Sequence, residues 1–217
     1  MIIPSFYIDD LIKRAISEDI NYIDSATAYV IPEDSVSTAR FVSKDSGVLC
    51  GIEIALRVFE LLDNGVKYEL FKSDGAAIEK GDIIAEITGK TQALLMGERT
   101  ALNILQHMSG ISSAVAAAVR LIEGSGACVA DTRKTLPGLR TLEKYAVTVG
   151  GGKNHRYNLS DCAMLKDNHI DAGGGIEKTV ALLRKKARPH SKNRGGNKRS
   201  QGGLRGAEQR CGYYYAR

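Results

Sequence analysis

Strand-like and helix-like segments alternate in the second half of the sequence, and this rhythm restricts the fold more than any other feature. Two short apolar segments, "ACVAD" (127–131) and "CAMLKD" (162–167), are each followed by a helical pattern, at 138–147 and 175–187. Such alternation is typical of βα units around a parallel sheet. It predicts an α/β barrel or a doubly wound sheet, with the working residues at the C-terminal ends of the strands and in the loops that follow.

The first half of the sequence has a different pattern. An amphipathic helix is expected from Phe6 to Ile16, and a long helix from 91 to 122 that is interrupted near Ser109 and Gly110, where helix propensity drops. Between them, short apolar runs bounded by turn residues predict four strands around one helix, at 39–44, 47–51, 66–71 and 82–87, with the helix at 51–62. We therefore expect an α/β chain with an N-terminal domain at 1–108 and part of a barrel or sheet domain at 109–192.

Cationic residues gather where the predicted strands end. Arg133 and Lys134 follow the first strand, residues 153–156 ("KNHR") lie before the next, and Lys166 ends that strand. If the strands are neighbours, these residues converge, and such a cluster repels itself unless an anion fills it. Guanidinium groups suit carboxylates and phosphates through paired hydrogen bonds. The glycines at 150–152 could let the backbone approach such a ligand closely.

Three segments resemble the quinolinate phosphoribosyltransferase family: "GERTALNILQHMSGIS" (97–112), "DTRKTLPGLRTLEKYAVTVGGGKNHR" (131–156) and "LSDCAMLKDNHI" (159–170). The likeness runs from about residue 5 to residue 192. It implies an N-terminal α/β sandwich followed by an α/β barrel, and a homodimer whose active site lies between subunits. It also implies the transfer of a phosphoribosyl group from phosphoribosyl pyrophosphate to quinolinate with Mg²⁺, which gives nicotinate mononucleotide, pyrophosphate and CO₂ in NAD synthesis.

The resemblance implies a set of substrate-binding residues that agrees with the cationic clusters, since both substrates are polyanions. Lys134 and Lys166 are also expected to act in catalysis, and Arg99 is expected to reach the partner subunit's site. The other positively charged side chains at 140, 144 and 153 are interpreted as auxiliary or surface charges, and His107 and His169 as framework residues. The full substrate-binding set is Arg99, Thr132, Arg133, Lys134, His155, Arg156 and Lys166.

Composition limits the class of protein further. The net charge of +5 comes from residues 184–217, with eleven Lys or Arg against one acid, whereas the rest of the chain has nineteen bases and twenty-four acids. The four cysteines form no C-x-x-C pair, and no secretory leader or membrane span is visible, so we expect a reduced, cytoplasmic protein. No metal ligands are assigned, because the acidic residues that the family uses near Mg²⁺ are expected beyond the matching segments.

The pattern breaks after Lys192. Where the family has an acidic and apolar strand followed by a helix, residues 193–217 are basic, glycine-rich and without periodicity, so we expect them to be disordered. Codons for Asn-Arg-Gly-Gly read one base later permit Ile-Glu-Val-Glu, which suggests a frameshift near Lys192 that resequencing of the codons from 190 to 220 would test. A barrel cut after its first strands leaves unpaired edges, so we expect this 217-residue chain to fold poorly or to be inactive.

Two other functions are considered. A related phosphoribosyltransferase with a different acceptor, such as the molybdenum-associated paralogue or nicotinate phosphoribosyltransferase, shares the same chemistry, and a substrate panel would distinguish it. A nucleic-acid-binding module is suggested by the basic tail and its three tyrosines at 213–215. That alternative leaves the "DTRKTLPGLR" segment unexplained.

Overall fold

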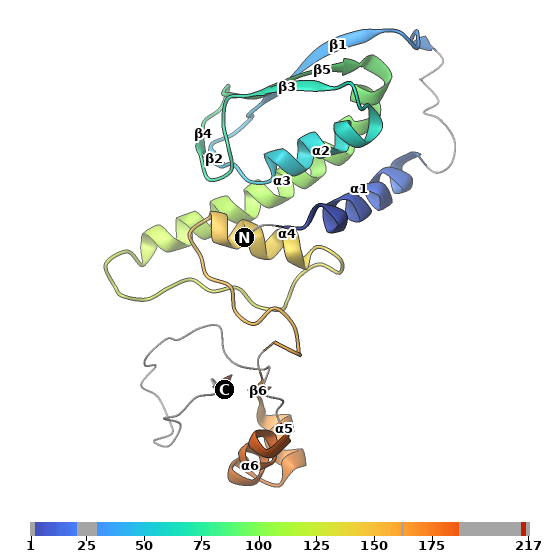
Figure 1. Ribbon diagram of the computed structural model, residues 1–217. Helices are drawn as coiled ribbons and strands as arrows, with labels where there is room; N and C mark the ends of the chain where they lie inside the picture. The colour runs from blue at the N-terminus through green and yellow to red at the C-terminus, as the bar shows by residue number, and fades with distance from the viewer. Residues whose placement is uncertain (1–2, 21–29, 162, 187–213, 216–217) are drawn as a thin grey trace. The chain divides into compact units, whose positions relative to one another are not determined.

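The computed structural model describes residues 3–20, 30–161, 163–186 and 214–215. The chain divides into two compact units, Met1–Asn154 and His155–Arg217, and each is described by itself. Figure 1 shows the first unit as a sheet with helices beneath it and the second as a short strand with two helices.

An antiparallel sheet forms the centre of the first unit. Its strands are β1 (Val36–Val42), β5 (Ile83–Lys90) and β3 (Lys67–Leu70), in the order β1-β5-β3. In the middle strand Ile84, Ala85 and Ile87 are buried. A second antiparallel pair joins β2 (Gly47–Val48) to β4 (Ala77–Ile78). The predicted strands of the N-terminal half are confirmed, although β2 is shorter than its apolar run suggested.

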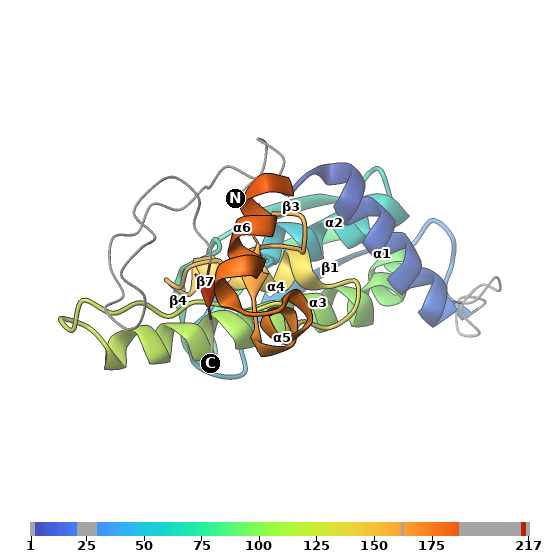
Figure 2. The same ribbon diagram turned by 90° about the horizontal axis from the view of Figure 1, so that it is seen from below.

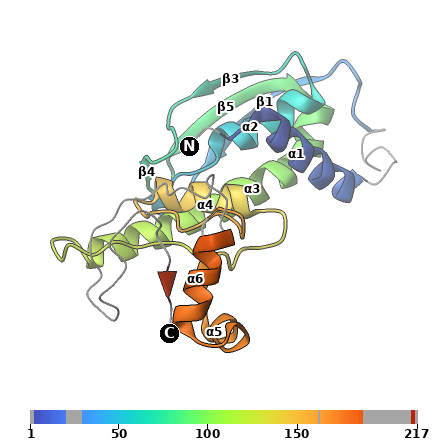
Figure 3. The ribbon, with the colours of Figure 1, turned by 60° about the horizontal axis from the view of Figure 1, so that its bottom comes forward.

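Three helices surround the core of this sheet. Helices α2 (Ile52–Leu62) and α3 (Thr91–Leu121) pack against each other below it (Figures 1 and 3). The rings of Phe41 on β1 and Phe59 on α2 meet edge to face, with centroids 6.1 Å apart. Helix α1 (Ser5–Ile20) buries Leu11 and Ile12 against this core. The sheet with helices packed on it is the predicted α/β sandwich.

Helix α3 runs without a break through Ser109 and Gly110, so the predicted interruption is wrong. The hydroxyl of Ser109 accepts a hydrogen bond from the Cys50 backbone N–H at 3.0 Å, and it lies 3.2 Å from the Cys50 carbonyl oxygen, to which it donates. Leu105 and Met108, in the turn before, are buried. These tertiary contacts outweigh the low local helix propensity.

The parallel βα arrangement predicted for the second half is present. Ala130 pairs in parallel with Lys153, and α4 (Arg140–Val149) forms the connection between them and packs on α3 (Figure 2). Residues 127–131 form only this single bridge rather than a full strand. Lys153 itself takes part in this pairing, a bridge that the sequence pattern does not predict.

The second unit contains β6 (Met164–Leu165), α5 (Asp167–Gly173) and α6 (Ile176–Lys186). Helices α5 and α6 lie against each other (Figure 3), and β6 pairs in parallel with β7 (Tyr214–Tyr215). The predicted disorder of 193–217 falls, apart from β7, outside the described residues. Within the described part of the chain, no helix has the length and apolar character needed to cross a membrane.

Candidate anion-binding site

The first cationic segment begins directly after the parallel pairing. The Asp131 N–H donates to the Lys153 carbonyl oxygen at 3.0 Å, and the chain then leaves the pairing as Thr132, Arg133 and Lys134. The Thr132 hydroxyl accepts from the backbone N–H of Lys134 at 3.0 Å, which folds the segment into a tight turn. The segment therefore lies at the C-terminal end of a parallel strand position, where α/β proteins place binding residues.

Arg133 is half-buried, and Lys134 is exposed beside it. The Nε atom of Arg133 is inaccessible to solvent and has no hydrogen-bond partner among the described residues. A buried guanidinium nitrogen without a partner is costly, because its hydration is lost and not replaced. The unsatisfied donor indicates that this arginine is held for a partner outside the described contacts.

Below this segment lies a buried ion pair that was not predicted. Lys144 on α4 is fully buried, and its Nζ atom donates to Oδ1 of Asp131 at 2.5 Å. When the amide of Asn154 is oriented with its nitrogen toward Asp131, that nitrogen donates to Oδ2 at 2.6 Å and to the Lys144 carbonyl oxygen at 2.9 Å. The interpretation of Lys144 as an auxiliary or surface charge misses this burial. The available signal was the carboxylate at Asp131, placed immediately before a cationic run.

The glycines at 150–152 serve the packing of helices. A Cβ atom on Gly150 would lie 2.5 Å from the Ser112 carbonyl oxygen and 2.8 Å from the Cβ of Val115, and Gly151 has φ +87°. A Cβ on Gly152 would lie 2.8 Å from the side chain of Val147. Gly150 and Gly152 thus allow the close packing of α3 and α4, whereas the approach of the glycine backbone to a ligand stays a prediction.

Helix α4 is also anchored to the N-terminal sheet region. The Tyr145 hydroxyl donates to Oδ2 of Asp74 at 2.9 Å, and Oδ1 of Asp74 accepts from the backbone N–H groups of Gly51 and Ile52 at the start of α2. Burial, followed by the charge of Asp74, raises the pKa of Tyr145 above its ordinary value. The helix that carries Lys144 is thus fixed at two points.

His155, Arg156 and Lys166 lie in the second unit. His155 and Arg156 are half-buried and directly follow Asn154 in the chain. Lys166 is exposed at the start of α5, and its backbone N–H donates to Nδ1 of His169 at 3.1 Å. The structure thus joins the ends of the segments at 131 and 153–154 within the first unit, whereas the convergence of all the cationic residues stays a prediction.

Arg99 is a predicted substrate-binding residue on α3, and two further histidines, His107 and His169, are predicted framework residues. Arg99 is exposed on α3. His107, also on α3, has its Nε2 atom 3.1 Å from Oε1 of Glu143 on α4, and His169 accepts the hydrogen bond that caps α5. Both histidines therefore make structural contacts, as predicted for framework residues.

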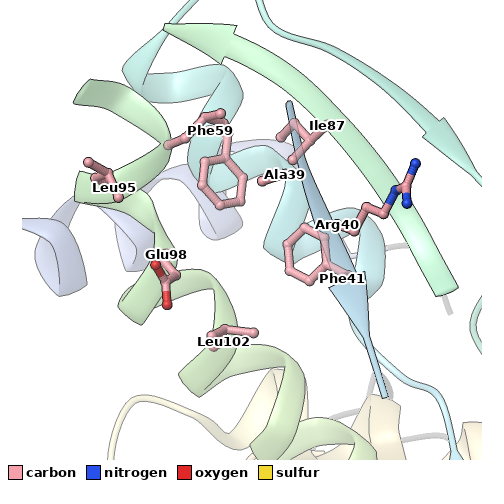
Figure 4. Close-up of a pocket in the computed structure, with 9 residues that line it drawn as sticks. Ala39, Arg40, Phe41, Phe59, Ile87, Leu95, Glu98 and Leu102 are labelled. Atoms are coloured by element: carbon pink, nitrogen blue, oxygen red, sulfur yellow. The ribbon is translucent and has the colours of Figure 1, made fainter. Parts of the chain in front are cut away.

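A separate pocket of about 310 Å³ lies between β1, β5 and α3. Figure 4 shows Phe41 and Phe59 on one side and Leu95, Glu98 and Leu102 on the other. The guanidinium of Arg40 at its edge is already paired with Glu86 at 2.7 Å. An apolar lining that includes the carboxylate of Glu98 does not suit a polyanion, and the cationic segment after the parallel pairing remains the candidate anion-binding site.

Comparison with known proteins agrees with this arrangement. A family model for the N-terminal domain of quinolinate phosphoribosyl transferase matches residues 24–109, and one for its C-terminal domain matches residues 111–193. The carboxylating nicotinate-nucleotide pyrophosphorylase of Mycobacterium leprae is 40% identical over 178 residues, which cover 81% of this chain and 63% of that protein. A probable enzyme of the same name from Bacillus subtilis is 44% identical over 177 residues, covering 82% of this chain and 61% of that protein.

Solved structures give the same result. NadC from Streptococcus pyogenes superposes with a TM-score of 0.82 at 44% identity. The superposed region covers 86% of this chain and 66% of the NadC chain. The nicotinate-nucleotide pyrophosphorylase of Ehrlichia chaffeensis superposes with a TM-score of 0.79 at 36% identity, covering 87% of this chain and 68% of its own. The chain spans about three fifths of the length of the two curated relatives above. On these matches across both domains, the chain belongs to the quinolinate phosphoribosyltransferase family.

Proposed function

We propose that the chain carries the substrate-binding chemistry of a carboxylating nicotinate-nucleotide pyrophosphorylase. The reaction joins quinolinate to phosphoribosyl pyrophosphate and releases pyrophosphate and CO₂, giving nicotinate mononucleotide for NAD synthesis. The observation that carries the proposal is the cationic segment Thr132–Lys134 at a parallel strand end, with the Nε of Arg133 buried and unsatisfied among the described residues.

The two substrates suit these side chains. Quinolinate carries two adjacent carboxylates, and the sugar donor carries a phosphate and a pyrophosphate. A guanidinium binds a carboxylate through two parallel hydrogen bonds, whereas a lysine ammonium acts as a compact charge. We assign Arg133 and Arg156 to carboxylate or phosphate recognition, and Lys134 and Lys166 to the charge that develops during reaction, with Thr132 and His155 as further binding residues.

The reaction then follows from positioning and charge. The ribosyl carbon loses pyrophosphate through an oxocarbenium-like state, and cationic side chains stabilise the negative charge on the leaving group. The pyridine nitrogen forms the new bond to that carbon, which requires that both substrates be held in line. The quaternised nitrogen next to the 2-carboxylate accepts the electron pair released when the bond to CO₂ breaks, and a proton replaces CO₂ on the ring.

Mg²⁺ stays a prediction from the family. The part of the chain that the structure describes contains no group of three or more His, Cys, Asp or Glu side chains placed to hold a metal ion. No described residue is therefore assigned as a Mg²⁺ ligand, and no step is assigned to the ion. Mg²⁺ is commonly held through substrate phosphates, and the pyrophosphate of the sugar donor is such a ligand.

The partner and location are part of the same proposal. Arg99 is exposed on α3, which is compatible with the role that the family resemblance implies, and we assign it to the active site of a second copy in a homodimer. A cytoplasmic location fits the buried, reduced Cys50.

The proposal is tested with the purified 217-residue chain, quinolinate, phosphoribosyl pyrophosphate and Mg²⁺. Nicotinate serves as the matched acceptor with one carboxylate, and nicotinate mononucleotide and CO₂ are both measured. Product from quinolinate supports the function and overturns the expectation that this chain is inactive. Binding of quinolinate without turnover supports the proposed binding site and also the expectation that this chain is inactive. Product from nicotinate alone, or no binding of quinolinate, contradicts the function.

A further inference from the structure

The contact between Lys144 and Asp131 is a buried pair of opposite charges. The Lys144 side chain has 0% relative exposure and the Asp131 side chain 7%, with Nζ and Oδ1 at 2.5 Å. Such a pair adds little to stability on balance, because removing both charges from water offsets their attraction. Apolar residues of similar volume often stabilise a core equally well. We therefore look for the role of this pair in the segments of the chain that it holds in position.

One carboxylate connects three parts of the chain. Oδ1 of Asp131 contacts α4 through Lys144, and Oδ2 contacts the end of the neighbouring parallel segment through the amide of Asn154. The backbone makes the same connection, since the Asp131 N–H donates to the Lys153 carbonyl oxygen and the Lys153 N–H donates to the Val129 carbonyl oxygen at 2.8 Å. Asp131 is thus fixed through both side-chain oxygens and its N–H.

The next residue after this fixed point is the first of the cationic segment. Thr132, Arg133 and Lys134 leave the pairing immediately after Asp131, and the turn is closed by the Lys134 N–H to the Thr132 hydroxyl. The Asn154 amide supports Asp131 from the other side, because its nitrogen donates to Oδ2 of Asp131 and to the Lys144 carbonyl oxygen. Any shift of Asp131 therefore moves the backbone from which Arg133 extends.

We propose that Asp131, Lys144 and Asn154 are positioning residues that hold the Thr132–Lys134 segment in its ligand-binding conformation before the ligand arrives. The identity of that ligand rests on the function proposed above, whereas the positioning itself does not. A binding group held in place by buried neighbours loses less conformational freedom on binding, which increases affinity and rate. A ring of partners around Asp131 provides that support here.

The first test needs no ligand. Asn154→Ala removes the bridging amide but keeps the ion pair, and Asn103→Ala, at an exposed position on α3, is the matched control. Hydrogen exchange of the backbone amides is measured by mass spectrometry. We expect exchange in residues 131–134 at least ten-fold faster in Asn154→Ala, with α4 unchanged, and no change in the control. Unchanged exchange at 131–134, or an equal increase in α4, overturns the proposal.

The second test separates positioning from stability. The double variant Lys144→Met with Asp131→Leu replaces the ion pair by apolar side chains, and its Tm and its quinolinate Kd are compared with those of the unaltered chain. We expect a Tm within a few degrees of that chain and a Kd at least ten-fold weaker. A folded double variant that binds quinolinate as tightly as the unaltered chain overturns the proposal.

The two tests also separate this proposal from the function. If the unaltered chain does not bind quinolinate, the proposed function fails, and the exchange measurement on Asn154→Ala still decides whether the residues position the segment. If the double variant does not fold, the quinolinate Kd of Asn154→Ala decides: a weaker Kd supports positioning, and an unchanged Kd overturns it.

Discussion

The hydroxyl of Tyr145 donates a hydrogen bond to Oδ2 of Asp74 at 2.9 Å, and this contact ties helix α4 to the loop before β4 and to the start of helix α2. Because α4 carries Lys144, the position of the proposed anion-binding segment depends on the N-terminal sheet region as well as on the parallel pairing. The stability of α4 is therefore coupled to that of the N-terminal sheet region through the contact between Tyr145 and Asp74.

Loss of this contact should destabilise the protein in a graded way. Tyr145→Phe removes one donor to a carboxylate and should lower the free energy of unfolding by about 1–2 kcal/mol. Asp74→Ala also removes the acceptor for the N–H groups of Gly51 and Ile52, and should cost about 2–3 kcal/mol. Urea denaturation measures both. Equal effects of the two variants would contradict the role of Asp74 at the start of α2.

Stability should fall at alkaline pH partly through Cys50. Burial raises the pKa of this thiol to about 12, while in the unfolded chain it ionises near its ordinary value of 9.0. Between these values the unfolded state loses the proton first, so the contribution of Cys50 is full below pH 9 and falls as pH rises, by at most about 1.4 kcal/mol per pH unit. The free energy of unfolding, measured by urea denaturation at several pH values from 8 to 10, should fall less steeply with pH in Cys50→Ala than in the unaltered chain. Cys128→Ala, at an exposed thiol, is the control, and a slope unchanged by Cys50→Ala would refute the assignment.

Two glycines, one inside α3 and one directly after α4, should respond in opposite directions to the same substitution. Gly150→Ala places a Cβ 2.5 Å from the Ser112 carbonyl oxygen, which forces α3 and α4 apart and should cost about 1–3 kcal/mol. Gly110→Ala, inside α3, meets nothing within 4 Å and should stabilise the protein by about 0.4–1 kcal/mol. Thermal unfolding measures both. A tolerated Gly150→Ala would mean that the two helices are not in the close contact described.

Arg156 and Lys166 are expected to act on the reaction rather than on the fold. Replacing Arg156 by Ala removes a guanidinium that positions a substrate anion, and replacing Lys166 by Ala removes a cation that faces developing charge. Each change should lower the rate of nicotinate mononucleotide formation on the order of 10²-fold. In a chain that turns over too slowly, the quinolinate Kd is measured instead. Lys178→Ala, at an exposed site on α6, is the matched control. Unaltered turnover or binding in Arg156→Ala would remove that residue from the site.

Much of the architecture was predictable from local patterns. The spacing of apolar residues located α4 and α6, and the alternation of segments predicted a parallel arrangement in this half of the chain, although it did not predict Lys153 as the partner of Ala130. These features depend on periodicity, which is a property of neighbouring residues in the sequence.

The sequence-based predictions fail where contacts between residues far apart in the sequence determine the local structure. Ser109 stays helical because its hydroxyl bonds to the backbone of Cys50, 59 residues away in the sequence. The space beside Gly150 is filled by Ser112 and Val115 of another helix. Lys144 is buried because Asp131, on a different element, supplies the opposite charge. None of these contacts follows from periodicity, although the carboxylate of Asp131 directly before a cationic run was a signal and the family resemblance located the cationic segments.

The proposed function requires that Arg133 and its neighbours recognise a pyridine with two adjacent carboxylates. The most direct measurement is calorimetric titration of the 217-residue chain, and of its Arg133→Ala variant, with quinolinate and with nicotinate. We expect at least ten-fold tighter binding of quinolinate than of nicotinate, and loss of that preference in Arg133→Ala, since one paired carboxylate contact is removed. Equal affinity for the two ligands, or an unchanged preference in Arg133→Ala, would contradict this requirement.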